Sequence, residues 1–296
     1  FSSSCRVTTL YGDPGAGKTT SLRYLAYEHA LGEDAIPLFL PLKSYRGEES
    51  IIEFAQTYIQ EHHRHPDLVQ FSSYLPQIFE SRPILLLLDG WNELELADGT
   101  SNESQFAYVL QSLFTNPNIQ CIISSRRSHR PLFDQVNADT GPISSKTGPA
   151  ASSDLPEVIE LRHLNSNSLH RFLEFYAGTQ SAQLVDLLRR HERLRTLANT
   201  PFRIKALCEV FDPNDSMPMS VGRLLEKYVK KCCERELARW NPIPNSQPMI
   251  DVWMAASAAF AFGVLSRTSV NAAVSTDIAL ASGMSRDAIR LLVGAG

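Results

Sequence analysis

The sequence predicts an α/β fold with a three-layer parallel sheet, followed by an all-α region. Strand-like and helical patterns alternate in the first half of the chain, and a glycine-rich loop joins the first strand to the first helix. Beyond Leu161 the strand patterns fade and helical patterns follow one another. Strands that alternate with helices favour parallel pairing through right-handed crossovers.

The predicted strands are short apolar runs. Residues 84–88 are continuously apolar, which is typical of a parallel strand buried on both faces. Residues 36–42 contain prolines, which suit a strand at the edge of a sheet. The other predicted strands are residues 6–11, 119–124 and 158–161.

Helical spacing of apolar residues predicts the remaining elements. In the first part of the chain the predicted helices are residues 19–26, 51–62, 68–81 and 105–114. Residues 137–156 are rich in Gly, Ser, Pro and Ala and predict a surface loop. The later predicted helices are residues 166–176, 182–196, 201–211, 221–240, 251–265 and 285–293.

Composition limits the classes of partner. The chain has 296 residues, more than one hydrophobic core usually serves, so we expect two or three domains. Its net charge of −4 provides no basic field for nucleic acid or an anionic membrane, and no run reaches the roughly 20 apolar residues of a membrane span. The cysteines form no C-x-x-C pair, which favours a reducing, cytoplasmic setting. Because the chain begins at Phe1 and stops abruptly at Gly296, we expect a fragment of a longer protein.

The loop after the first strand fits the phosphate-binding pattern G-x-x-x-x-G-K-[ST] at every fixed position. Such a loop wraps backbone N–H groups around the phosphates of a nucleotide. Lys18 is expected to contact the β- and γ-phosphates, and the Thr19 hydroxyl to ligate Mg²⁺. The predicted contact residues are Gly12, Asp13, Pro14, Gly15, Ala16, Gly17, Lys18, Thr19 and Thr20.

Two acidic residues follow the third predicted strand. Asp89 ends the strand, where ligands of an open α/β sheet bind, and can hold Mg²⁺ through its water shell. Glu93 can orient or deprotonate an attacking water. The alternative is a strand-end Asp that caps a turn, with Glu93 in solvent.

Arg126 closes the fourth predicted strand, at the same edge of the sheet. There it can contact the γ-phosphate and report its presence. Arg127 competes for this role, and a surface arginine paired with a carboxylate is the alternative.

These motifs together resemble the NACHT branch of the STAND signalling NTPases. Leu88-Asp-Gly-Trp-Asn-Glu-Leu94 resembles the Walker B run of the family, and Ile122-Ile-Ser-Ser-Arg126 is similar to its sensor strand. Leu197-Ala-Asn-Thr-Pro-Phe202 resembles the helical-domain motif in which the proline, here Pro201, packs near the adenine. Residues 217–228 resemble the entry to a winged helix.

The resemblance implies a P-loop nucleotide-binding domain at 1–161, a helical domain at 162–215 and a truncated winged-helix domain at 216–296. It implies that ADP holds the domains closed, and that exchange for ATP opens them. The opened copies would then oligomerise and bring effector domains outside this fragment together, in signalling or in innate immune or antiphage defence. Asn92 stands where the family often has Asp, which implies slow hydrolysis.

Other functions remain open at this point. A mechanochemical AAA-type ATPase would turn over ATP continuously, but such proteins usually place an acid directly after the magnesium Asp, where this chain has Gly90. A non-hydrolysing scaffold that holds ADP is compatible with Asn92. A small-molecule kinase leaves the helical region without a purpose, and the acidic balance gives a DNA-binding winged helix no support.

Overall fold

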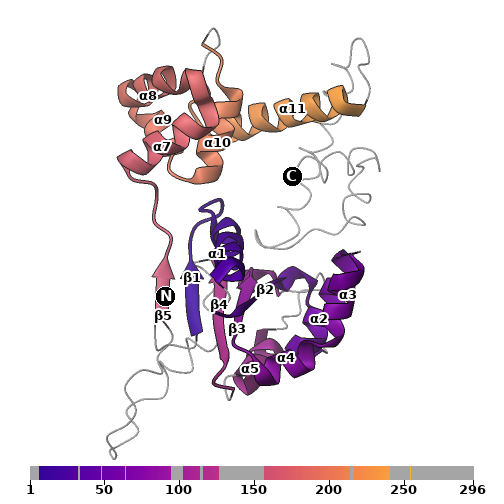
Figure 1. Ribbon diagram of the computed structural model, residues 1–296. Helices are drawn as coiled ribbons and strands as arrows, with labels where there is room; N and C mark the ends of the chain where they lie inside the picture. Colours follow the sequence, from indigo (N-terminus) through magenta and orange to yellow (C-terminus); the bar gives the residue numbers. More distant parts are fainter. Residues whose placement is uncertain are drawn as a thin grey trace, which may run out of the picture. The chain divides into compact units, whose positions relative to one another are not determined.

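The computed structural model divides the chain into two compact units, Phe1–Arg162 and His163–Gly296, each with its own hydrophobic core. The first unit is an α/β sheet layered with helices, and the described part of the second is helical (Figure 1). None of the helices in the described parts combines the length and hydropathy that a membrane span needs. The structure describes residues 7–32, 34–47, 49–63, 65–94, 103–113, 116–126, 157–213, 217–240 and 254.

A five-stranded parallel sheet forms the centre of the first unit, in the order β2-β3-β4-β1-β5. The sequence prediction of a parallel sheet with the proline-containing strand at its edge is therefore confirmed. In the register of the strands, Tyr11 pairs with Ser125 and Pro41 with Asp89. The carboxyl ends of these four strands therefore lie at the same end of the sheet. The strands are β1 (Val7–Tyr11), β2 (Ile36–Pro41), β3 (Ile84–Asp89), β4 (Ile119–Ser125) and β5 (Glu157–Glu160).

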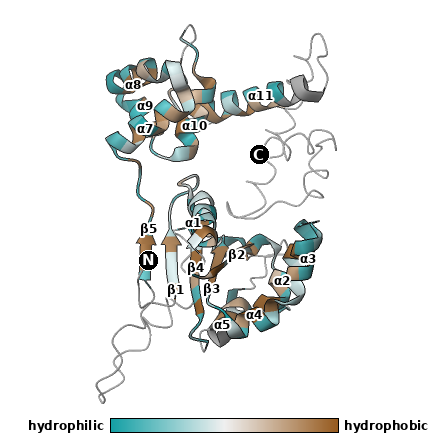
Figure 2. Ribbon diagram, viewed as in Figure 1, coloured by the Kyte–Doolittle hydropathy of each residue, from teal (hydrophilic) through white to brown (hydrophobic). Residues whose placement is uncertain are grey.

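Helices cover both faces of this sheet. Alternate side chains of β3 point to opposite faces, so Leu86 packs in a core with α2, α4 and α5, whereas Leu87 packs with Leu22 of α1. Both faces of β3 and β4 are apolar, as the predominantly brown colour of these strands shows (Figure 2). The helices described in this unit are α1 (Lys18–Gly32), α2 (Ile51–His62), α3 (Pro66–Ser73), α4 (Leu75–Ser81) and α5 (Glu103–Leu113).

The prediction of one helix over residues 68–81 is wrong, because the chain breaks at Tyr74 between α3 and α4. Pro76 has no N–H to donate to the carbonyl of Ser72, so an uninterrupted helix would lose a hydrogen bond there. The side chain of Gln56 donates to that carbonyl instead, with an N–O distance of 3.0 Å.

Five helices are described in the second unit: α7 (Ser166–Ala177), α8 (Ser181–Arg190), α9 (Glu192–Leu197), α10 (Pro201–Val210) and α11 (Val221–Trp240). The prediction of one helix over 182–196 is wrong, because His191 is extended and separates α8 from α9. At about 100° per residue, an unbroken helix would point Leu197 away from Leu188. The break lets both side chains enter the same core.

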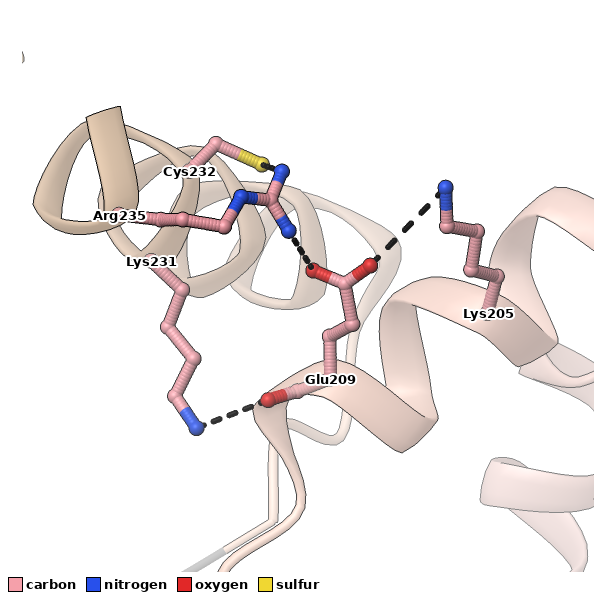
Figure 3. A network of polar contacts seen from close by, with 5 residues as sticks. All are labelled: Lys205, Glu209, Lys231, Cys232 and Arg235. Atoms are coloured by element: carbon pink, nitrogen blue, oxygen red, sulfur yellow. Dashed lines mark hydrogen bonds and ion pairs between the residues drawn. The ribbon is translucent and has the colours of Figure 1, made fainter. Parts of the chain in front are cut away.

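A polar network joins α10 to α11 (Figure 3). The Glu209 carboxylate accepts a hydrogen bond from Arg235 of α11 at 3.3 Å and pairs with Lys205 at 4.0 Å. Lys231 donates to the Glu209 backbone carbonyl at 2.8 Å, where α10 ends and carbonyls lack helical partners. These contacts fix α11 against the end of α10.

Three predicted segments lie outside the described residues: 137–156, 285–293 and, apart from residue 254, 251–265. Most of the winged-helix domain predicted for 216–296 lies there too, so that domain stays a prediction.

Candidate functional site

The glycine-rich loop joins β1 to α1, the setting that a phosphate-binding loop requires. Gly15 and Gly17 have φ values of 77° and 97°, in the left-handed region that side chains rarely adopt. Gly12 is confined, because a Cβ there would lie 3.2 Å from the Cβ atoms of both Ala16 and Leu161. The glycines are therefore required by the path of the backbone.

Lys18 begins α1 and points back over the loop. Its ammonium donates to the backbone carbonyls of Gly12 at 2.7 Å and Asp13 at 3.2 Å. Burial lowers the pKa of Lys18, as does the nearby Arg126 guanidinium, while Asp89 opposes both effects. A phosphate in the loop would relieve this partly desolvated charge.

Asp89, at the end of β3, is held at both carboxylate oxygens. Thr19 donates to Oδ2 at 2.7 Å, and Ser124 of β4 donates to Oδ1 at 2.6 Å. The backbone N–H of Gly90 in turn donates to the Ser124 hydroxyl at 2.9 Å. This hydrogen-bonded chain ties the first turn of α1 to the ends of β3 and β4, and fixes the direction of the carboxylate.

Glu93 ends a short 3₁₀ turn, Trp91–Glu93, that begins at Gly90. Gly90 has a φ of 86°, and a Cβ at this position would lie 2.9 Å from Cδ of Glu93. Asn92 is buried, whereas Glu93 lines a cavity beside Thr19 and Asp89. Glycine after Asp89 thus allows Glu93 to lie against the backbone near the site.

The electrostatics of Glu93 suit a base, although the residue is exposed to solvent on its cavity side. Burial raises its pKa, and the neighbouring Asp89 carboxylate raises it further. Lys43, Arg126 and Lys18 lower it in part. A carboxyl with a raised pKa is a stronger base once it is ionised.

Arg126 directly follows β4 and is half-buried. Its effects on the pKa values of Lys18 and Glu93 place its charge within electrostatic reach of both side chains. Arg127, its competitor for the sensor role, lies outside the described residues.

Pro201 belongs to the second unit, so its role near the adenine stays a prediction. Locally it is the first residue of α10, where a missing N–H costs nothing. The preceding Thr200 caps the helix, accepting from the backbone N–H of Arg203 at 3.4 Å. The remaining predicted contact residues lie on the loop and the first turn of α1: Asp13, Pro14, Ala16 and Thr20.

Sequence reasoning missed the roles of Ser124 and Lys43. Ser124 lies in the predicted sensor strand, and the parallel pairing of Leu88 with Ile123 puts the next residues, Asp89 and Ser124, side by side. Lys43 follows β2, whose last residue pairs with Asp89, and it lines the cavity with Glu93. Both signals depend on strand order, which the sequence pattern did not provide.

The donor set near the loop fits Mg²⁺. Thr19 and Asp89 offer hard oxygen ligands, and Mg²⁺ is usually held by one or two protein oxygens together with phosphates and waters. Among the described residues no group of three or more His, Cys, Asp or Glu could hold a metal by itself. The arrangement therefore suits an ion that arrives with a phosphate ligand.

The chain is similar to one protein family model and to solved structures. A family model of the NACHT domain matches residues 6–174, more than half of the chain. Among solved structures, the chain is similar to a Walker-type ATPase of Pyrococcus abyssi, with 13% identity and a TM-score of 0.44, over 97% of this chain and 85% of that chain. It is also similar to AMPPCP-bound DnaA from Aquifex aeolicus, with 12% identity and a TM-score of 0.42, over 99% of this chain and 82% of that chain. No curated protein sequence matches. The chain belongs to the NACHT domain family of P-loop NTPases.

Proposed function

We propose that the chain is an ATP- and ADP-binding molecular switch that hydrolyses ATP slowly. The observation that carries the proposal is the hydrogen-bonded chain from Thr19 through Asp89 to Ser124. It connects the phosphate loop to the ends of two strands. In this proposal, gain or loss of a phosphate in the loop therefore affects α1, β3 and β4 together.

In this proposal each side chain has one task. Lys18 and the loop N–H groups hold the phosphates, and Thr19 and Asp89 hold Mg²⁺. The ion, when bound, neutralises charge on the phosphate oxygens. Glu93 accepts a proton from the attacking water, and Arg126 contacts the γ-phosphate.

Slow turnover follows from the acids that are present. Glu93 is the one acidic side chain of the Trp91–Glu93 turn. The neighbouring Asn92 cannot act as a base, and it is buried outside the cavity lining. Hydrolysis then rests on a single carboxyl of this turn. A long-lived ATP state is what a switch needs, because the bound nucleotide can act only while it persists.

The biological role proposed for this switch is signalling in the cytoplasm, in innate immune or antiphage defence. ADP would hold the nucleotide, helical and winged-helix parts together, with Pro201 coupling the helical part to the base. ATP would favour an open form that associates with further copies of the chain and gathers effector domains. A membrane or nucleic-acid partner is not part of the proposal, because the net charge of −4 attracts neither.

The test is to denature the purified chain and identify the released nucleotide by chromatography. Co-purified ADP is the expected result and supports a resting switch. An empty site followed by rapid turnover of added ATP would contradict the proposal and favour a motor-type ATPase. Comparing turnover in the wild type and in Glu93→Gln then separates slow hydrolysis from a pure ADP-binding scaffold, in which the substitution changes nothing.

A further inference from the structure

Two short turns follow neighbouring strands beside the proposed nucleotide site. β2 and β3 pair in parallel as far as Pro41 and Asp89, the last residues of the two strands. The 3₁₀ turn Leu42–Ser44 follows β2, and the 3₁₀ turn Trp91–Glu93 follows β3. The two turns contact each other, so their side chains leave the sheet at the same place.

Both turns are anchored in one part of the core. Leu42 and Trp91, the first residues of the two turns, are fully buried. The Trp91 ring lies 5.9 Å from the ring of Phe106 in α5, and the ring of Tyr45, which directly follows the first turn, lies 4.7 Å from the same Phe106 ring. Both pairs pack edge to face, which is a favourable geometry for aromatic rings. Phe106 therefore holds the two turns in a fixed relation to each other.

One exposed side chain from each turn lines the cavity beside Asp89: Lys43 and Glu93. They carry opposite charges, and among the described residues neither side chain forms a hydrogen bond or an ion pair. Of the three cations that lower the pKa of Glu93, Lys43 has the largest effect, ahead of Arg126 and Lys18. The Lys18 ammonium is already held by two loop carbonyls. Lys43 is therefore the cation best placed to act on Glu93.

The charge of Lys43 opposes a repulsion that acts on Glu93 from within its own strand end. The Asp89 carboxylate raises the pKa of Glu93, which means that it disfavours the Glu93 charge. The Glu93 carboxyl lies over Gly90, where the missing Cβ leaves it room. Attraction by Lys43 counteracts the repulsion and favours rotamers in which the carboxylate points into the shared cavity.

We propose that Lys43 is a positioning residue for Glu93: its ammonium holds the carboxylate in the cavity, beside Thr19 and Asp89, where the attacking water would lie. The inference rests on the proposed hydrolysis of ATP. In that reaction the water oxygen bonds to the γ-phosphorus, the bond from this phosphorus to the ADP oxygen breaks, and Glu93 accepts the proton that the water loses. Lys43 takes no part in these bond changes and acts through Glu93.

The test is the rate of ATP hydrolysis in a single turnover, with the full chain, cleared of bound nucleotide, in excess over radiolabelled ATP and with Mg²⁺ present. Lys43→Met removes the charge and keeps the apolar stem, whereas Lys43→Arg keeps a charge. Arg23→Gln is the matched control, because Arg23 lines the same cavity but lies 5.4 Å from the centroid of the Phe39 ring and is not among the charges that shift the pKa of Glu93. Lys43→Met is also made in the Glu93→Gln background, and the affinities for ADP and AMPPCP are measured on the same proteins.

We expect Lys43→Met to lower the rate constant about tenfold, because a misplaced base loses part of the roughly 10²–10⁴-fold that such a group contributes. Lys43→Arg and Arg23→Gln should hydrolyse ATP at a rate close to that of the wild type. In the Glu93→Gln background Lys43→Met should cause no further loss, because the residue acts through Glu93. Its affinities for ADP and AMPPCP should match those of the wild type.

Three results would overturn the proposal while a slower Glu93→Gln still supports the proposed function. The first is a wild-type rate in Lys43→Met, or a rate in Lys43→Arg as low as in Lys43→Met. The second is an equal further loss in the Glu93→Gln background. The third is a loss of AMPPCP affinity that matches the loss of rate, because Lys43 would then act on the nucleotide itself. Equal rates in the wild type and in Glu93→Gln, or no hydrolysis by the wild type, would refute the proposed hydrolysis and this proposal with it.

Discussion

Replacing Ser124 by alanine removes the hydroxyl at the centre of the hydrogen-bonded chain. Ser124 is fully buried, and its hydroxyl donates to Asp89 at 2.6 Å and accepts from the Gly90 N–H at 2.9 Å. A hydrogen bond to a charged group contributes about 1.5–3 kcal/mol, and a buried N–H without a partner costs about 1–3 kcal/mol. Because the two effects overlap, we expect Ser124→Ala to lower the free energy of unfolding by about 2–4 kcal/mol.

Urea denaturation followed by tryptophan fluorescence measures this loss. Trp91 is fully buried in the first unit, so a background of Trp240→Phe and Trp253→Phe makes the signal specific to that unit. With a urea slope of about 2 kcal/mol per M, the expected loss moves the midpoint down by about 1–2 M.

Thr9→Val is the matched control. Thr9 is also fully buried, on the adjacent strand β1, and its hydroxyl has no hydrogen-bond partner among the described residues. Its removal should leave the midpoint unchanged or raise it, because no bond is lost. Equal midpoints for Thr9→Val and Ser124→Ala would refute the idea that the Ser124 bonds hold this site together.

Three further predictions concern other parts of the structure. Gly90→Ala would put a Cβ 2.9 Å from Cδ of Glu93 at a residue whose φ is 86°. We therefore expect its free energy of unfolding to be about 1–2 kcal/mol lower in the same urea assay, and an unchanged value would show that the turn is not strained. Burial raises the pKa of Glu93, so its favourable contribution is complete below the ordinary value of 4.5 and is lost as the pH rises through the raised value. Glu93→Gln should therefore raise the melting temperature slightly near pH 7 but not near pH 4, with a small gain because the side chain is partly exposed; an equal effect at both pH values would argue against burial. Glu209→Ala should destabilise the contact of α10 with α11 by about 1 kcal/mol. A double-mutant cycle with Arg235→Ala should show a coupling energy of about 0.5 kcal/mol. Zero coupling would mean that the ion pair drawn in Figure 3 contributes nothing to stability.

The sequence predicted the strands and the glycine-rich loop well because local patterns decide them. The apolar run of β3 and the glycines of the loop carry their own signals, and both have the predicted structure. The helix predicted over 182–196 was wrong for a different reason. The break at His191 has no proline or glycine to mark it, and it follows from the need of Leu188 and Leu197 to share one core.

The candidate site was predictable for residues whose type and position in the chain both fit a motif. Lys18, Thr19 and Asp89 stand at fixed places relative to a strand or a loop, and the structure brings them together. Ser124 and Lys43 were missed because their importance depends on which strands are neighbours. Periodicity gives the number of strands, but their order is set by packing between distant segments.

The central claim is that the loop around Lys18 binds nucleotide. Calorimetric titration of ADP and of AMPPCP, with Mg²⁺, into the wild type and Lys18→Ala tests it most directly, with Arg82→Ala as a control that removes one exposed cation elsewhere in the unit. We expect saturable binding of both nucleotides to the wild type and the control. We expect its loss in Lys18→Ala, because the phosphates lose their main cationic partner. Unchanged affinity in Lys18→Ala would contradict the assignment of the site.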